Sequence, residues 1–193
     1  MSVDEAAAPM LWLREVRSAP GRQNLAYDLR RLVRGRRPLP PGPVRRVLVI
    51  CHGNICRSPF AARLLSARAP QLEVRGGGLA ASAGRPAEPG ALRAARAFGL
   101  DLADHRSRPL DADALAWADL VLGMEGHHVA SVRARHPEAG ARTFILGDFL
   151  DRPPYLIPDP WGQPDEVFLR TFRRIERATD ALLAALGKHE GSC

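Results

Sequence analysis

The chain has 193 residues, which is enough for one domain with a sizeable core, and its formal net charge of +7 is carried almost entirely by arginine, which favours an anionic partner. No apolar run is long enough to span a membrane, and the acidic opening residues lack the pattern of a secretory signal. The three cysteines, Cys51, Cys56 and Cys193, are too few for the disulfide framework of a secreted domain, so we expect a cytoplasmic protein.

Residues 1–43 form a basic, Pro-rich N-terminal extension that differs from the rest of the chain. A short helix is expected over residues 24–33, and the Pro-rich stretch at 36–43 is typical of an extended linker. Three interpretations stay open for the extension: a solvated tail, a helix packed on the domain, or a basic arm for acidic partners.

Residues 44–193 predict a single α/β domain, because short apolar runs alternate with helical patterns. The expected strands are parallel and cover residues 47–50, 72–75, 119–122 and 143–146, the second ended by the glycines at 76–78. The expected helices cover residues 60–69, 89–98 (closed by Gly99), 125–135 and the C-terminal region. The first should begin with Ser58 as its N-cap and Pro59 as its first residue. The last carries one apolar stripe made of Phe168, Phe172, Ile175, Thr179, Leu182 and Leu186.

The loop after the first strand carries the strongest chemical signal, Cys51-His52-Gly53-Asn54-Ile55-Cys56-Arg57-Ser58-Pro59. A loop between a buried strand and a helix start directs N–H groups at one point, and the helix dipole attracts an anion there. Gly53 and Asn54 tolerate the left-handed backbone that such convergence needs. Arg57 can hold two phosphate oxygens with its planar fork. Cys51 is expected there as a thiolate placed in line with phosphorus.

No cluster of His, Asp or Glu has convincing metal-ligand spacing, so we expect neither a metal nor another cofactor. His127 and His128 are adjacent rather than one helical turn apart, which favours a solvated face.

The nine-residue loop resembles that of the low-molecular-weight protein tyrosine phosphatase family, whose pattern Cys-x-Gly-Asn-x-Cys-Arg-Ser-Pro it matches without a gap. The similarity extends over residues 44–186, including segments near His105, Asp119 and Asp159. It implies a single three-layer α/β domain with a central four-stranded parallel sheet and a phosphate-binding loop after the first strand. It also implies a phosphotyrosine phosphatase that needs no metal and forms a phosphocysteine intermediate.

The resemblance assigns a role to each matching residue. Cys51 is the nucleophile, Arg57 binds phosphate and Asp159 is the general acid and then the base. The substrate-binding and phosphate-binding residues are His52, Gly53, Asn54, Ile55, Cys56, Ser58 and Trp161. His105 supports the loop at Asn54, Ser58 hydrogen-bonds the Cys51 sulfur, and Cys56 forms a reversible disulfide with Cys51 under oxidants.

The sequence departs from the family in the region after its second expected strand. Gly76-Gly77-Gly78 stands where many members have Ser-Ala-Gly, so a serine that supports the loop asparagine is missing. We therefore expect a less rigid loop with lower turnover. Residues 79–87 lack the aromatic side chain that many members place there, which leaves specificity open.

Two other functions are weighed against this one. An arsenate reductase of the same fold relays electrons through two further cysteines downstream, whereas only Cys193 follows the loop here. A non-catalytic phosphate-binding module would lack a nucleophile or an acid, yet Cys51 and Asp159 are both present. Nucleic acid is a poor partner because no interleaved aromatics accompany the charge. The expected partner is a phosphotyrosine protein, with a bacterial tyrosine kinase as the candidate by analogy, bound by a monomer or weak dimer.

Overall fold

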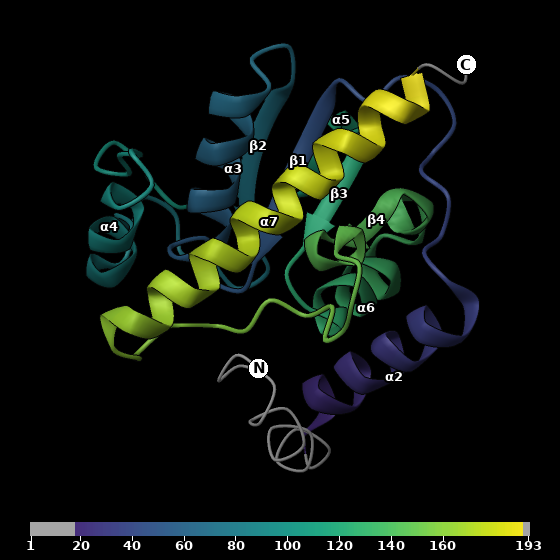
Figure 1. The fold of residues 1–193 in the computed structure, drawn as a ribbon, viewed down its shortest axis with the longest axis horizontal. Coiled ribbons are helices and arrows are strands. Elements are labelled where there is room, and N and C mark those ends of the chain that lie inside the picture. The colour runs from purple at the N-terminus through teal and green to yellow at the C-terminus, as the bar shows by residue number, and fades with distance from the viewer. Residues whose placement is uncertain (1–17, 191–193) are drawn as a thin grey trace.

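A parallel sheet of four strands forms the centre of the protein, whose computed structural model describes residues 18–190 (Figure 1). The strands lie in the order β2-β1-β3-β4 and are β1 (Arg46–Cys51), β2 (Glu73–Gly78), β3 (Leu120–Gly123) and β4 (Thr143–Ile145). All three pairings are parallel. The predicted α/β fold with a loop after its first strand is therefore confirmed.

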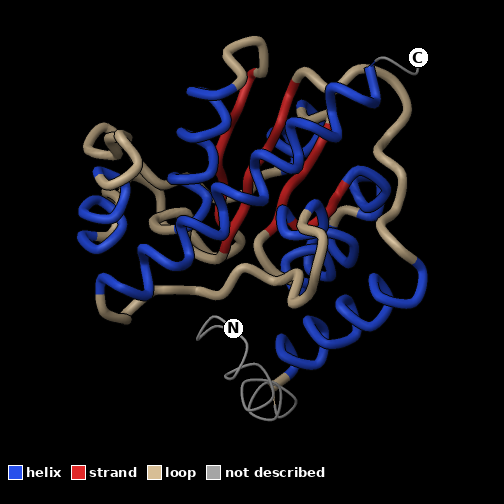
Figure 2. Tube along the Cα trace, viewed as in Figure 1, coloured by secondary structure: helices blue, strands red, loops and turns tan. Residues whose placement is uncertain are grey.

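Helices cover both faces of this sheet and make three layers (Figure 2). One face carries α3 (Arg57–Arg68), α4 (Pro89–Arg96) and α7 (Asp165–Glu190). The opposite face carries α5 (Ala112–Trp117), α6 (Gly126–Arg135) and the 3-10 helix η1 (Pro137–Arg142). A second 3-10 helix, η2 (Leu146–Phe149), follows β4. Since β1 is buried on both sides, its uninterrupted apolar sequence fits a central parallel strand.

The long helix α7 crosses the sheet diagonally and closes the larger core (Figure 1). All six residues of its predicted stripe are buried, with none more than 7% exposed. Phe172 stacks on Phe60 of α3 with ring centroids 3.9 Å apart. Within residues 18–190, no helix combines the length and the apolar composition that crossing a membrane requires.

The glycines at 76–78 were expected to end the second strand. They instead form the second half of β2, beside the C-terminal half of β1. The reason is a close approach to the loop that follows β1. A Cβ atom at Gly78 would lie 2.9 Å from both the Asn54 nitrogen and the His52 carbonyl oxygen. The glycine run therefore lets the edge strand continue alongside the loop that follows β1.

Residues Ala19–Arg34 of the extension form a helix, α2, that packs on α6 (Figure 1). Of the three interpretations above, a helix packed on the domain is the one that these residues fit. The packed face is polar and includes Asn24 and Asp28, whereas Leu29, Leu32 and Val33 are exposed. The linker that follows is tied to the domain by Arg37, which donates to the carbonyl oxygen of Thr143 and lies over the Phe144 ring.

Candidate active site

The loop between β1 and α3 turns its main-chain N–H groups inward. The carbonyl groups of Cys51, His52 and Ile55 accept hydrogen bonds of 2.9 to 3.0 Å from backbone N–H groups outside the loop. Across a trans peptide the carbonyl and the following N–H point in opposite directions. The N–H groups of His52, Gly53 and Cys56 are therefore directed to the inner side of the loop.

The N–H groups of residues 52–56 donate to no acceptor within residues 18–190. Residues 54–56 are nevertheless buried, where unpaired backbone donors are rare. These donors directly precede the N-terminus of α3, whose dipole adds positive potential. A concave group of N–H donors of this kind suits a tetrahedral oxyanion.

Asn54 holds the loop in its turn. It is the only non-glycine residue of the described chain with a positive φ, at 51°, a conformation that asparagine adopts more readily than most residues. Its side chain donates to Ser58 Oγ at 2.8 Å and accepts from the backbone N–H of Arg108 at 2.9 Å. His105 Nε2 lies 2.7 Å from its carbonyl oxygen and donates to it. Burial lowers the pKa of His105, so the ring is neutral and carries its proton on Nε2.

Cys51 lies at the base of the loop and is 2% exposed, with its Sγ 3.0 Å from Ser58 Oγ. The expected N-cap at Ser58 is wrong: α3 begins at Arg57, with Cys56 as its N-cap. Ser58 Oγ accepts a hydrogen bond from Asn54 Nδ2, so its own proton is free to be donated to the Cys51 sulfur.

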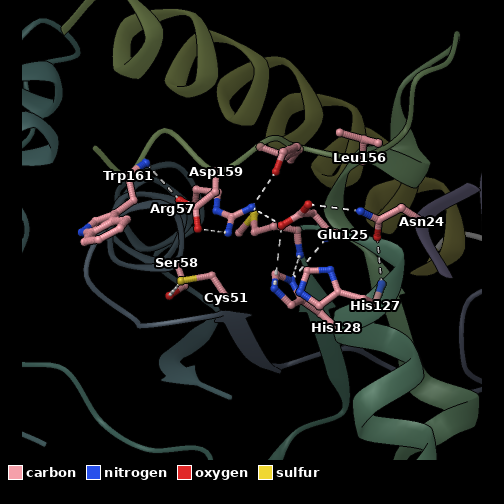
Figure 3. Close-up of polar contacts among 12 residues, drawn as sticks. Asn24, Cys51, Arg57, Ser58, Glu125, His127, His128, Leu156, Asp159 and Trp161 are labelled. Carbon is pink, nitrogen blue, oxygen red and sulfur yellow. Dashed lines mark hydrogen bonds and ion pairs between the residues drawn. The ribbon is translucent and has the colours of Figure 1, made fainter. Parts of the chain in front are cut away.

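Arg57 is 1% exposed and is held between two carboxylates (Figure 3). Its NH1 donates to Glu125 Oε2 at 2.6 Å and to the Ile157 carbonyl at 2.8 Å, and its NH2 donates to Asp159 Oδ2 at 2.6 Å. Burial acts against the charge, but Glu125 and Asp159 outweigh it and raise the pKa of the guanidinium above its ordinary value. The buried Nε finds no acceptor in the described chain. The Nε–NH2 edge is thus the one suited to a phosphate.

Asp159 and Trp161 lie together on the loop before α7 (Figure 3). The Asp159 carboxylate accepts from Arg57 through one oxygen and from the Trp161 backbone N–H, at 3.2 Å, through the other. Trp161 is 64% exposed, which is unusual for so large an apolar side chain. The structure therefore brings an acid and an exposed aromatic ring to the side of Arg57.

Glu125 is a site residue that sequence reasoning missed. It follows β3, the neighbour of β1, and the carboxyl ends of parallel strands meet at one edge of the sheet. This position directly after a predicted strand was the signal in the sequence that could have identified Glu125 as a site residue. Its second oxygen, Oε1, accepts a 3.2 Å hydrogen bond from Asn24 Nδ2 of the extension (Figure 3).

His127 and His128 do not form the solvated face that was expected. His128 is fully buried, and its Nδ1 accepts from the backbone N–H groups of Met124 and Glu125 at 3.0 and 3.3 Å. Glu125, His127 and His128 bring ligand-type atoms within 4.8 Å of one another. Because Nδ1 of His128 is an acceptor, its Nε2 carries the proton and offers no lone pair to a metal. In this arrangement neither nitrogen of His128 offers a free lone pair to a metal ion.

Cys56 lies buried in the same loop as Cys51, and both are free thiols. Burial raises the pKa of Cys56 well above its ordinary value, so this thiol stays protonated. A reversible Cys51–Cys56 disulfide stays a prediction.

Behind the loop, Gly76 faces the Asn54 side chain, and the two line a cavity of about 350 Å³ together with His105 and Arg108. A Cβ atom at Gly76 would lie 3.0 Å from Asn54 Nδ2. A serine at position 76, which many family members have, would place its side chain against Asn54, and Gly76 lacks that contact.

Comparison with known proteins places this site in context. The sequence model of the family "Low molecular weight phosphotyrosine protein phosphatase" matches residues 46–192. The chain is 37% identical over 133 residues to the low molecular weight protein-tyrosine-phosphatase Etp of Escherichia coli K12, covering 69% of this chain and 88% of Etp.

Two solved structures are similar to the whole domain. The tyrosine phosphatase AmsI of Erwinia amylovora matches with a TM-score of 0.73 and 32% identity, covering 77% of this chain and 97% of AmsI. The YwlE arginine phosphatase of Geobacillus stearothermophilus matches with a TM-score of 0.71 and 35% identity, covering 77% and 96%.

Proposed function

The chain belongs to the low molecular weight phosphotyrosine protein phosphatase family, and from this premise we propose that it hydrolyses phosphotyrosine and other aryl phosphate monoesters through a phosphocysteine intermediate on Cys51. The observation that carries the proposal is the group of unpaired N–H donors at residues 52–56, three of them directed inward, in the loop that begins at the buried Cys51. These donors bind the three non-bridging phosphate oxygens, and the sulfur lies beneath them in line with the leaving group.

In the first step the Cys51 thiolate attacks phosphorus. The S–P bond forms as the bond from phosphorus to the phenolic oxygen breaks, and Asp159 gives its proton to that oxygen. A tyrosine phenol has a pKa near 10, so protonating the leaving oxygen is worth about 10²- to 10⁴-fold in rate. The loop amides and Arg57 stabilise the charge on the transferring group.

In the second step a water molecule attacks phosphorus on the opposite side from the sulfur. Asp159 takes the proton from this water, the S–P bond breaks, and inorganic phosphate leaves while the thiolate is restored. Ser58 supports both steps, because its hydroxyl donates a hydrogen bond to the Cys51 sulfur. In the free enzyme this bond stabilises the sulfur anion, and in hydrolysis it stabilises the sulfur as the leaving group.

Arg57 couples substrate binding to the acid. Glu125 and the Ile157 carbonyl hold its NH1, while Asp159 holds NH2. A phosphate dianion binding the Nε–NH2 edge takes the place of the Asp159 carboxylate on NH2. Asp159 is then released from the ion pair, takes up a proton from water and is free to approach the leaving oxygen.

The test is hydrolysis of phenyl phosphate by the wild type, Cys51→Ser and Asp159→Ala, with Cys193→Ser, a cysteine outside the loop, as the matched control. We expect no turnover with Cys51→Ser, a severe loss with Asp159→Ala, and turnover near wild type with Cys193→Ser. Rapid acid quench after mixing with labelled substrate should leave phosphate on the protein, and a label on any residue other than Cys51 contradicts the mechanism.

We further propose that the natural substrate is a phosphotyrosine protein, with a tyrosine kinase as the candidate. The exposed ring of Trp161 beside Asp159 suits stacking with a phenyl group. Because one of the similar structures is that of the YwlE arginine phosphatase, the assay should compare a phosphotyrosine peptide with a phosphoarginine peptide of the same sequence. Preference for the phosphoarginine peptide contradicts this choice of substrate.

A further inference from the structure

We propose that Asn24, on helix α2 of the N-terminal extension, is a positioning residue for the phosphate-binding arginine. It acts through Glu125 and so makes the extension part of the active-site architecture. The inference rests on the proposed function, because it concerns how Arg57 is presented to a phosphate. The family model matches only from residue 46 onward, so Asn24 lies outside the matched region.

Asn24 is a buried polar side chain with two directed hydrogen bonds (Figure 3). It is 3% exposed, and its Nδ2 donates to Glu125 Oε1 at 3.2 Å. Its Oδ1 accepts from the backbone N–H of His127 at 3.0 Å. His127 lies in the first turn of α6, where backbone N–H groups have no partner inside the helix. One amide group from α2 therefore caps α6 and fixes the carboxylate beside the site.

Helix α2 is seated so that Asn24 has little freedom to leave this position. Gly126 permits the approach, because a Cβ atom there would lie 2.6 Å from Tyr27 Cβ and 2.9 Å from the Gln23 carbonyl oxygen. Further along α2, Tyr27 donates a hydrogen bond to the Asp148 carboxylate, and Arg31 forms an ion pair with the same carboxylate. The helix is thus anchored by contacts that are separate from Asn24.

The two oxygens of Glu125 have different partners, which is what fixes its direction. Oε1 accepts from Asn24, and Oε2 accepts from Arg57 NH1. With NH1 held, the planar guanidinium can offer only its Nε–NH2 edge to a phosphate. If Asn24 is removed, Glu125 loses one of its two anchors and can rotate. The arginine fork then becomes less well oriented for the substrate.

The experiment compares Asn24→Ala and Asn24→Asp with Tyr27→Phe in the full-length chain. Tyr27→Phe is the matched control, since it removes a hydroxyl that anchors α2 but does not contact Glu125 or Arg57. We expect Asn24→Ala to lower kcat/KM for phenyl phosphate by about 3- to 30-fold, the usual range of coupling between contacting residues. Tyr27→Phe should leave kcat/KM within about twofold of wild type while lowering Tm at least as much.

Asn24→Asp gives a readout that a purely structural role would not move. It keeps an oxygen for the His127 N–H, but it sets a second carboxylate against Glu125. Two close carboxylates repel unless they share a proton. We expect the largest loss of kcat/KM with this variant at pH 7.5, and partial recovery relative to wild type at pH 5.5. This variant decides the matter if Asn24→Ala does not fold, because it retains the cap on α6.

The inference is overturned if both Asn24 variants keep the kcat/KM and the pH profile of Tyr27→Phe, since Asn24 would then only dock α2. Orthophosphate binding, measured by calorimetry in the Cys51→Ser background, separates this outcome from failure of the proposed function. If the wild type does not turn over aryl phosphates, weaker orthophosphate binding on adding Asn24→Ala still supports the inference. Unchanged orthophosphate binding in that comparison rejects it.

Discussion

Asp159 Oδ2 lies 2.6 Å from NH2 of Arg57, so the residue proposed as the acid is paired with the residue proposed to bind phosphate. Glu125 occupies the other terminal nitrogen of the same guanidinium at 2.6 Å. The two carboxylates differ in exposure, because the Glu125 side chain is 12% exposed and that of Asp159 is 40% exposed. The buried partner is placed to stay on the arginine and the exposed partner is placed to leave it.

The exposed partner should control the chemistry of the leaving group. Asp159→Asn keeps the size of the side chain and removes its proton donor. We expect kcat for phenyl phosphate to fall by about 10²- to 10⁴-fold. The loss should be clearly smaller for p-nitrophenyl phosphate, whose leaving group is more acidic and needs less protonation. Steady-state kinetics with both substrates checks this, and equal losses would show that Asp159 does not protonate the leaving oxygen.

The buried partner should control stability. Glu125→Ala removes the carboxylate that pairs with NH1 of Arg57, whose side chain is only 1% exposed. Breaking such a pair from one side should lower the free energy of unfolding by about 2–4 kcal/mol. Glu125→Gln keeps an acceptor oxygen for Arg57 and should cost less. Urea unfolding monitored by circular dichroism measures both, and a Glu125→Ala variant as stable as wild type argues against this pairing.

Restoring the family serine should stiffen the loop. A Cβ atom at Gly76 lies 3.0 Å from Asn54 Nδ2, so the loop side chain must move by a few tenths of an ångström to admit it. The serine hydroxyl can then accept a second hydrogen bond from Nδ2. We expect Gly76→Ser to raise Tm and kcat together, whereas Gly76→Ala, which adds only the crowding, should raise neither. No gain from Gly76→Ser would contradict the expected looseness of this loop.

The buried His128 should make stability depend on pH. Burial, followed by the nearby charges of Arg57, His127 and His52, lowers its pKa well below the ordinary value of 6.5. Below pH 6.5 the unfolded chain binds a proton at this residue and the folded chain does not. The contribution of His128 to the free energy of unfolding is therefore complete above pH 6.5. It is lost as the pH falls, by up to about 1.4 kcal/mol per pH unit.

Substitution isolates this contribution from that of His105 and His127, whose pKa values burial also lowers. His128→Asn keeps an acceptor for the Met124 and Glu125 N–H groups but cannot be protonated. The difference in unfolding free energy between wild type and variant should shrink steadily from pH 6.5 to pH 5. A difference that does not change with pH would mean that His128 is protonated equally in both states.

The local sequence determined the elements and the loop. An apolar run that is buried on both sides specifies β1, and steps of three and four specify the stripe of α7, because each depends on one period along the chain. The loop from Cys51 to Pro59 could be interpreted for the same reason, since its glycine, asparagine and arginine act on their own backbone. Sequence reasoning erred even within this loop at Ser58, because its hydroxyl bonds Cys51 and Asn54 and does not cap α3.

Only the tertiary structure decided which carboxylates surround Arg57. Asp159 is 102 positions away from it and Glu125 is 68, and neither separation carries a pattern that a local period could indicate. The same holds for Asn24, which reaches Glu125 across 101 positions from a helix whose apolar side faces solvent. The sequence by itself thus determined the loop from Cys51 to Pro59, because its pattern lies in consecutive residues. The packing of parallel strands and of α2 decided the rest, because it brings together groups that the chain order keeps apart.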